Sequence, residues 1–221
     1  NSHQMTWILL RGLTREHRHW GNFPQLLQSA IPQAKIITPD LPGSGIHHEQ
    51  TCPGSIKDIL EFIRADIEIQ QFKKPVHILG LSLGAMIGIE WLRQYPQECA
   101  TAVLMNTSLK GLNPFYQRLR PGNYWKILNG LFVTNNIRAR ENIIFNLTCN
   151  LNQNRDTIIN NWVSYASEHP VSKLNALRQL IAATTYRIPE QKPERPILLL
   201  RSLGDRLVNP SVRKAWRNTG H

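Results

Sequence analysis

A serine between two glycines is the side chain in this sequence best suited to act as a nucleophile. The segment Gly80–Gly84 reads Gly-Leu-Ser-Leu-Gly and stands between the apolar run Val76–Leu79 and a helix-like stretch that begins at Ala85. In such a turn between a strand and a helix, the serine adopts a strained backbone conformation and its hydroxyl projects away from the sheet. Because glycines lack a β-carbon, they let the strand and the helix approach closely. The pattern predicts that Ser82 is a nucleophile, and the alternative is an ordinary serine in a tight turn.

Four segments in the same order resemble the α/β-hydrolase superfamily, with the turn around Ser82 as its nucleophile elbow. Residues 9–13 followed by Trp20 resemble the strand that ends in His-Gly in that family, and residues 38–45 are similar to its Asp-x-x-Gly-x-Gly turn. Residues 196–210 look like the strand and loop that carry the catalytic acid. The resemblance covers nearly the whole chain, most weakly in its middle third. It implies an α/β fold: a mostly parallel sheet flanked by helices, with an inserted helical cap.

The resemblance also implies a catalytic triad, because a serine hydroxyl is a poor nucleophile without a general base and an acid that orients the base. In this fold the order along the chain is serine, acid, histidine. Asp205 occupies the place of the acid after the run Pro196–Leu200, although it could instead cap the following helix. The second position at which the family places an acid holds Asn106 in this chain.

His221 is the candidate base, because it is the only histidine after Asp205 and because Gly220-His221 resembles the Gly-His of the family. A helix from Pro210 to about Arg217 would leave three residues before His221, whereas a typical strand has about 5–6 residues. We expect that residues are missing from this sequence, or that the chain is a natural truncation with impaired activity, and we favour the first. A terminal histidine without a role is the alternative.

The family resemblance places an oxyanion hole at the backbone amides of Leu13 and Leu83. Arg11 departs from the family pattern, because histidine usually precedes the glycine of this loop. Two roles are open for Arg11. It would pair with a nearby carboxylate and brace the loop, or it would bind an anionic part of the substrate, and we favour the brace.

Short apolar runs closed by glycine or proline predict strands, and helical apolar spacing predicts helices between them. The expected strands are 6–10, 34–38, 76–79, 101–105 and 196–200, and the expected core helices are 20–30, one that opens at 55–58, and one from the elbow to about Gln94. Ser55–Asp58 resembles a capping box, and the face expected to be buried on its helix comprises Ile56, Ile59, Leu60, Ile63 and Ile67. This alternation predicts a parallel sheet with ligand chemistry at the carboxyl ends of its strands.

Residues 109–190 interrupt this alternation, because about 80 residues are too many for an ordinary connection between two strands. We expect a helical cap here and an α/β core formed by residues 1–108 and 191–221. Cap helices are expected at 125–131, 137–147, 155–167 and 174–184. The segment holds ten basic and four acidic residues. Its aromatic residues, among them Trp125 and Trp162, would either select the substrate or pack the helices together.

The remaining histidines are expected to be structural or solvated. His77 alternates within a strand, which predicts a buried and hydrogen-bonded position. His47 and His48 are expected to be solvated loop residues, although they lie near the predicted active edge and could contact the substrate. Surface positions are expected for His17, His19 and His169, none of which follows Asp205.

The composition fits one globular domain with an insertion: 221 residues, of which 41% are hydrophobic. No apolar run is long enough to span a membrane, and the N-terminus lacks the features of a signal peptide. Three widely spaced cysteines suit free thiols in the cytoplasm. The net charge of +11 comes without a nucleic-acid-binding motif, so nucleic acid is not expected as the primary partner. Neither a metal nor an organic cofactor is expected.

The leading functional hypothesis is a serine hydrolase that cleaves a small carboxylic ester or thioester through an acyl-enzyme, with Ser82 as nucleophile, His221 as base and Asp205 as acid. A second hypothesis keeps the fold and changes the reaction to acyl transfer or to lyase chemistry. A third is a non-catalytic, hydrolase-like binding protein, which requires that the chain truly ends at His221.

Overall fold

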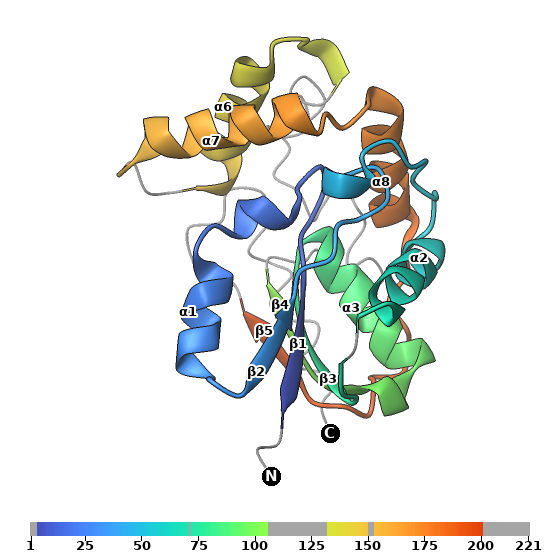
Figure 1. The fold of residues 1–221 in the computed structure, drawn as a ribbon. Coiled ribbons are helices and arrows are strands. Elements are labelled where there is room, and N and C mark those ends of the chain that lie inside the picture. Colours follow the sequence, from blue (N-terminus) through green and yellow to red (C-terminus); the bar gives the residue numbers. More distant parts are fainter. Residues whose placement is uncertain (1–3, 71, 106–131, 150–152, 201–221) are drawn as a thin grey trace.

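A five-stranded parallel sheet forms the centre of the molecule (Figure 1). The computed structural model describes residues 4–70, 72–105, 132–149 and 153–200. The strands are β1 (Met5–Leu10), β2 (Ala34–Ile37), β3 (Val76–Leu81), β4 (Cys99–Met105) and β5 (Ile197–Leu200), in the order β2-β1-β3-β4-β5. All neighbouring pairs run parallel. The parallel sheet expected from the alternating pattern is therefore confirmed.

The chain reverses its direction of progress across the sheet between β1 and β3. From β1 the chain adds β2 on one side, and then crosses back to place β3 on the other side of β1. The two central strands end together, because Leu10 pairs with Gly80 in the β1–β3 register. In open parallel sheets, ligands bind in the crevice outside the carboxyl ends of the strands at such a reversal. The topology alone thus points to the loops after Leu10 and Leu81.

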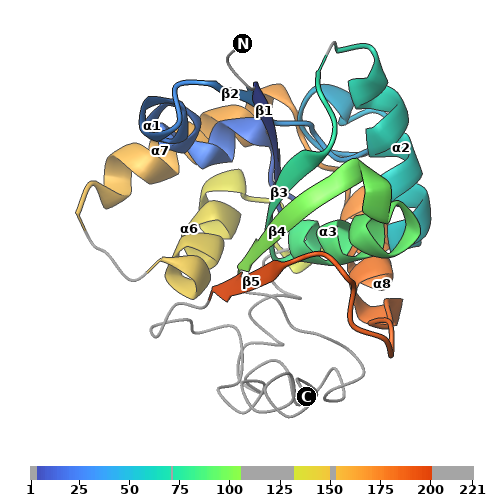
Figure 2. The same ribbon diagram turned by 90° about the horizontal axis from the view of Figure 1, so that it is seen from below.

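Helices cover both faces of the sheet (Figure 2). One face is covered by α1 (Phe23–Ala30), and the other by α2 (Ile56–Glu68) and α3 (Leu83–Gln94). The helix α8 (Lys173–Thr185) lies on the side of α2 and α3, toward the carboxyl ends of the strands (Figure 1). The helices α6 (Ile137–Thr148) and α7 (Arg155–Glu168) pack against each other beyond the carboxyl ends of the strands. Three short 3-10 helices complete the described elements: His17–Trp20, Gly45–His47 and Pro96–Glu98.

The core divides into two hydrophobic clusters because alternate side chains of a strand point to opposite faces. Ile8 and Ile78 belong to the larger cluster beneath α2 and α3, whereas Leu9 and Leu79 belong to the smaller cluster with Trp20. All of these side chains are buried. Burial on both faces explains why the strands appear in the sequence as continuous apolar runs.

The capping of α2 follows the prediction with one difference. The five residues expected to be buried on α2 are all buried, and the Ser55 hydroxyl accepts a hydrogen bond from the Asp58 amide at 3.2 Å. The Asp58 carboxylate accepts a hydrogen bond from the Ser55 hydroxyl at 2.8 Å. The short aspartate therefore bonds the side chain of Ser55, where the glutamate of a full capping box would reach back to the backbone.

The helices expected within residues 109–190 begin and end close to where the sequence predicts them. The structure places α6, α7 and α8 within one residue of the ranges expected at each end, whereas the expected helix 125–131 lies outside the described residues. The expected helix 20–30 begins at Phe23, because Trp20 closes a 3-10 helix and Gly21 follows with a φ of +59°. Within the described ranges, no helix combines the length and apolar character needed to cross a membrane.

Candidate active site

Ser82 occupies the sharp turn between β3 and α3. Its backbone has a φ of +59° and a ψ of −115°, and its side chain is exposed. Positive φ is strained for a residue with a β-carbon and costs on the order of 1–3 kcal/mol, so it persists only where the surroundings enforce it. The conformation predicted for a nucleophile elbow is thus the one that Ser82 adopts.

The two glycines of the elbow are required by close backbone approach. A β-carbon added at Gly80 would lie 2.5 Å from the Gly84 carbonyl oxygen, and one added at Gly84 would lie 2.2 Å from the Leu10 carbonyl oxygen. Both distances are far shorter than a carbon–oxygen contact allows. Gly84 therefore lets the first turn of α3 pack directly against the end of β1.

The loop after β1 lies beside the serine. A β-carbon added at Gly12 would lie 3.0 Å from the Ser82 β-carbon and 3.4 Å from its hydroxyl oxygen. Gly12 is also the first residue of a four-residue turn, in which the Arg15 amide donates to the Gly12 carbonyl at 3.1 Å. The two loops at the reversal of the sheet therefore meet at the Ser82 hydroxyl.

Both residues expected to form the oxyanion hole belong to these two loops. Leu83 is the first residue of α3, so its amide has no acceptor within the helix. Leu13 follows Gly12 directly, so its amide belongs to the peptide group that packs against Ser82. The helix N-terminus also favours negative charge at this point. This placement agrees with the expected role, which stays a prediction.

The acid and base of the expected triad belong to segments outside the described residues. Asp205, His221 and Trp125 lie outside the described residues, as does Asn106. The described residue directly before Asn106 is Met105, whose carbonyl accepts a hydrogen bond from the Ser82 amide at 3.0 Å. The roles of Asp205 and His221 therefore remain predictions.

Arg11 is a half-buried cation that the structure pairs with an aromatic ring. Its guanidinium carbon lies 5.0 Å from the centre of the Trp20 ring, and its Nε is buried without a hydrogen-bond partner among the described residues. Burial, together with the nearby Arg15 cation, lowers the pKa of Arg11 to about 9. The described residues provide no salt bridge to Arg11. The favoured carboxylate brace is therefore not found in the described part of the chain.

Trp162 packs α7 against its neighbours. Its ring lies 5.7 Å from the His19 ring and 5.8 Å from the Phe145 ring on α6. The Arg15 guanidinium lies 5.2 Å from the same ring. These contacts support the packing interpretation of Trp162, and its expected substrate contact stays a prediction.

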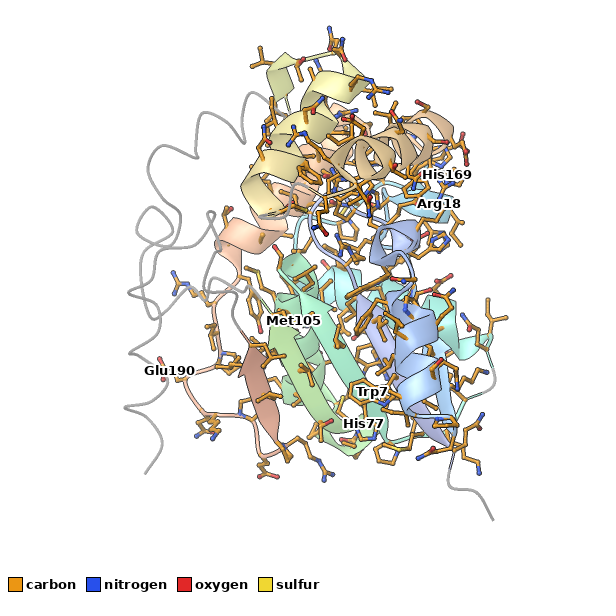
Figure 3. The ribbon with its side chains drawn as sticks, turned by 90° about the vertical axis from the view of Figure 1, so that its left-hand side faces the viewer. Trp7, Arg18, His77, Met105, His169 and Glu190 are labelled. Atoms are coloured by element: carbon orange, nitrogen blue, oxygen red, sulfur yellow. The ribbon has the colours of Figure 1, made fainter. Side chains whose placement is uncertain are left out.

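A network of charged and polar side chains joins the loop after β1 to α6 and α7. Arg15 forms a buried ion pair with Glu141 on α6 at 2.8 Å, with only 8% and 4% of the two side chains exposed. Arg18 reaches Glu168 at the end of α7 at 2.6 Å and His169 at 3.1 Å (Figure 3). The inserted helices are thus held over the carboxyl edge by electrostatic contacts as well as by packing.

The expected surface position is wrong for His19. Its ring is enclosed between Trp162 and Tyr165, and burial together with Arg15 lowers its pKa far below the usual range. His17 is half-buried and bonds Asp40 at 2.8 Å, which raises the pKa of His17. His169 is also only partly exposed. Each has a partner distant in the sequence, which local composition does not reveal.

His47 and His48 are also less solvated than expected. Both residues are half-buried. His47 lies 3.1 Å from Asp66 and His48 packs 5.0 Å from the His169 ring. His77, by contrast, is hydrogen-bonded as expected: it is half-buried and lies 2.7 Å from the Thr101 hydroxyl.

Potential metal ligands and free thiols are dispersed in the part of the chain that the structure describes. The described residues contain no group of three histidine, cysteine or acidic side chains arranged to hold a metal. Cys52, Cys99 and Cys149 are free, and burial raises the pKa of Cys52 and Cys99 to about 12, which makes these thiols unreactive. A cavity of about 20 Å³ lies beside His19 and Glu141. That is room for about one water molecule.

Comparison with known proteins adds a family match over nearly the whole chain. The model of a family described as alpha/beta hydrolase fold matches residues 8–219. The 2-hydroxy-6-oxononadienedioate/2-hydroxy-6-oxononatrienedioate hydrolases 1 and 2 of Pseudomonas putida are 25% and 27% identical over 128 residues. The aligned segment is 58% of this chain and only 44% of each relative, so this chain spans about half the length of the curated relatives that it matches.

Solved structures share the same fold. A candidate lipase from Acinetobacter baumannii superposes with a TM-score of 0.73 at 22% identity, covering 98% of this chain and 73% of that one. An esterase from Rhodococcus superposes with a TM-score of 0.68 at 18% identity, covering 96% and 77%. At these identities the likeness establishes the architecture alone.

The close approach at Gly84 predicts a large loss of stability on a minimal substitution. Gly84→Ala should lower the free energy of unfolding by about 3 kcal/mol or more, because the new methyl group overlaps the Leu10 carbonyl. Gly54→Ala is the matched control, because a β-carbon at Gly54 meets nothing within 4 Å, and it should change stability by less than about 0.5 kcal/mol. Denaturant unfolding of both variants is the measurement. Equal stabilities would contradict the packing described for the elbow.

Proposed function

The chain belongs to the alpha/beta hydrolase fold family, and on that premise we propose that it is a serine hydrolase of a small carboxylic ester or thioester. The observation that carries this proposal is the strained backbone of Ser82 beside Gly12 at the reversal of the sheet. Holding a serine in this conformation costs folding free energy, and such strain is concentrated at functional sites. The exposed hydroxyl is accessible to a substrate at the carboxyl edge.

The proposed reaction proceeds through an acyl-enzyme. Ser82 Oγ attacks the carbonyl carbon of the substrate while His221 accepts the hydroxyl proton, and Asp205 orients the imidazole. The tetrahedral intermediate collapses, and His221 donates the proton to the leaving alcohol or thiol. A water molecule, deprotonated by the same histidine, then attacks the acyl carbon and releases the acid and free Ser82.

The backbone amides of Leu13 and Leu83 are proposed to bind the oxyanion. Preorganised donors of this kind contribute the largest share of catalysis in many enzymes, and loss of one costs about 10²–10³ in turnover. The position of Gly12 against the Ser82 side chain supports this assignment. The Leu13 amide is the next one along the same loop.

The insertion 109–190 is proposed to act as a cap over this site. Its described helices α6 and α7 lie beyond the carboxyl ends of the strands, and Arg15 and Arg18 fasten them to the loop that borders Ser82. A segment held in this position would limit which substrates reach the serine.

Arg11 is proposed to recognise a carboxylate group of the substrate. Its guanidinium is half-buried, and its Nε has no hydrogen-bond partner among the described residues, so a buried anion would satisfy it. The curated relatives are named for dienedioate and trienedioate substrates, which carry two carboxylates. The proposed substrate is therefore a small ester or thioester with a carboxylate at a distance from the scissile bond.

Lyase chemistry on the same fold is the second candidate. It would use the triad to move a proton without an acyl-enzyme. The discriminating observation is whether Ser82 becomes acylated during turnover. An acyltransferase would form the same acyl-enzyme and differ only in the acceptor.

Covalent labelling tests the nucleophile. A fluorophosphonate probe should label full-length protein at Ser82, because phosphonylation requires an activated serine, and Ser82→Ala should abolish the labelling. Ser167→Ala, on the surface of α7, is the matched control and should leave labelling unchanged. Mass spectrometry of the labelled peptide is the measurement. Labelling that survives in Ser82→Ala would place the nucleophile elsewhere.

The acid is tested by an isosteric change. Asp205→Asn should reduce kcat by about 10⁴-fold while the protein stays folded, because the amide stabilises the wrong tautomer of the catalytic histidine. Asp156→Asn, at an exposed position on α7, is the control and should retain kcat. Steady-state kinetics with circular dichroism checks both. Near-normal turnover in folded Asp205→Asn would move the acid to another residue.

The carboxylate proposal predicts a change in substrate preference. Arg11→Met should lower kcat/KM for a carboxylate-bearing ester by about 10–100-fold relative to its neutral analogue, because a hydrogen bond to a charged group contributes about 1.5–3 kcal/mol. Arg138→Met removes an exposed arginine and should leave the ratio unchanged. Relative kcat/KM for the ester pair is the measurement. A parallel fall for both esters would mean that Arg11 only braces the loop.

A further inference from the structure

Gln179 is a fully buried amide whose two polar ends are both occupied. It lies on α8 with 0% of its surface exposed. Its Oε1 accepts a hydrogen bond from the Thr14 amide at 2.8 Å. Its Nε2 donates to the Ser44 hydroxyl at 2.9 Å, and lies 3.4 Å from the Pro42 carbonyl oxygen. One side chain of the insertion thus connects two loops at the carboxyl edge of the sheet.

The hydrogen bond to the Thr14 amide bears most directly on the site, because this amide is next in the chain to the Leu13 amide proposed to bind the oxyanion. The hydrogen bond from Arg15 to the Gly12 carbonyl fixes the peptide group that contains the Leu13 N–H. Gln179 fixes the following peptide group through the Thr14 N–H. The two bonds together set the direction of the Leu13 amide relative to Ser82.

Thr14 does not favour its own conformation. It has a φ of +58°, and β-branched residues rarely adopt positive φ. In a four-residue turn the third position takes positive φ readily only with glycine or asparagine. An external partner is therefore needed to keep this turn in place, and the Gln179 side chain is such a partner.

The other end of Gln179 is fixed by a residue that is itself buried. Ser44 has 0% of its surface exposed, and it belongs to the turn after β2, where its amide donates to the Leu41 carbonyl at 3.0 Å. The bond from Gln179 Nε2 to the Ser44 hydroxyl therefore leaves the Gln179 amide little rotational freedom. Its Oε1 is consequently presented to Thr14 in one orientation.

We propose that Gln179 is a positioning residue for the oxyanion hole, acting through the Thr14 amide on the neighbouring Leu13 amide. The inference rests on the proposed function, in which Leu13 donates to the oxyanion. It gives the insertion a second role: a helix far along the chain holds a catalytic amide in place, in addition to covering the site.

Asn175 provides a matched comparison on the same helix. It lies one turn before Gln179 and is 7% exposed. Its Oδ1 accepts from the Cys52 amide at 2.9 Å, and its Nδ2 donates to the Gln50 carbonyl at 3.0 Å. It is a buried amide that bridges α8 to a core loop, but its partners lie in the segment before α2 and not in the loop beside Ser82.

The test compares Gln179→Met with Asn175→Leu in full-length protein. Each change keeps the approximate volume, removes the acceptor of one buried backbone amide, and should lower the melting temperature. Gln179→Met should also lower kcat by about 10–100-fold with KM within about twofold, because the oxyanion exists only in the transition state. Asn175→Leu should leave kcat within about twofold of wild type.

A second variant separates geometry from stability. Gln179→Glu keeps an oxygen acceptor for the Thr14 amide. Its kcat should be at least about threefold higher than that of Gln179→Met. Ser44→Ala removes only the support of Nε2, so it should lower kcat by less than Gln179→Met while KM again stays constant.

Fluorophosphonate labelling of Ser82, measured in the same samples, distinguishes failure of the proposed function from failure of this inference alone. Wild-type protein without Ser82-dependent labelling would overturn the proposed function and this inference with it. Labelled wild type together with a folded Gln179→Met of unchanged kcat would overturn this inference alone. Equal losses of kcat in Gln179→Met and Asn175→Leu would also overturn it, because a general loosening of α8 would then explain both.

Discussion

The close contact between two backbone segments at the carboxyl edge of the sheet is the constraint on which the site depends. The first turn of α3 approaches the end of β1 so closely that Gly84 has no room for a methyl group beside the Leu10 carbonyl. This contact forces the sharp turn at Ser82 and brings Gly12 against its side chain. The strain in Ser82 is therefore offset by the packing of the sheet, and the hydroxyl and the adjacent amides are arranged by the same contact.

A second layer of polar contacts holds the inserted helices against this edge. The Arg15–Glu141 pair is almost entirely buried, and burial of two charges carries a desolvation cost that only good geometry and further bonds offset. Such a pair adds little stability over an apolar contact, but it fixes one arrangement of α6 relative to the loop after β1. Gln179 provides the corresponding link from α8. The insertion contributes acidic side chains, Glu141 and Glu168, to this attachment.

Local features were predicted from the sequence and long-range contacts were not. The elbow at Ser82 and the buried face of α2 were predictable because each depends on residues within one or two turns of the chain. The bond from Thr14 to Gln179 spans 165 residues, and no spacing or composition rule links positions so far apart. His19 was expected at the surface for the same reason: its enclosure depends on α7, which lies far along the chain.

The central claim is that Ser82 forms a covalent acyl-enzyme, and the most direct measurement is the mass of the protein during turnover. An aryl carbamate transfers a carbamoyl group that leaves serine slowly, so the intermediate accumulates. We expect release of one equivalent of the aryl alcohol and a matching mass increase on the peptide that contains Ser82. Continued release of the alcohol by wild-type protein with Ser82 unmodified would contradict the account and favour a reaction without an acyl-enzyme.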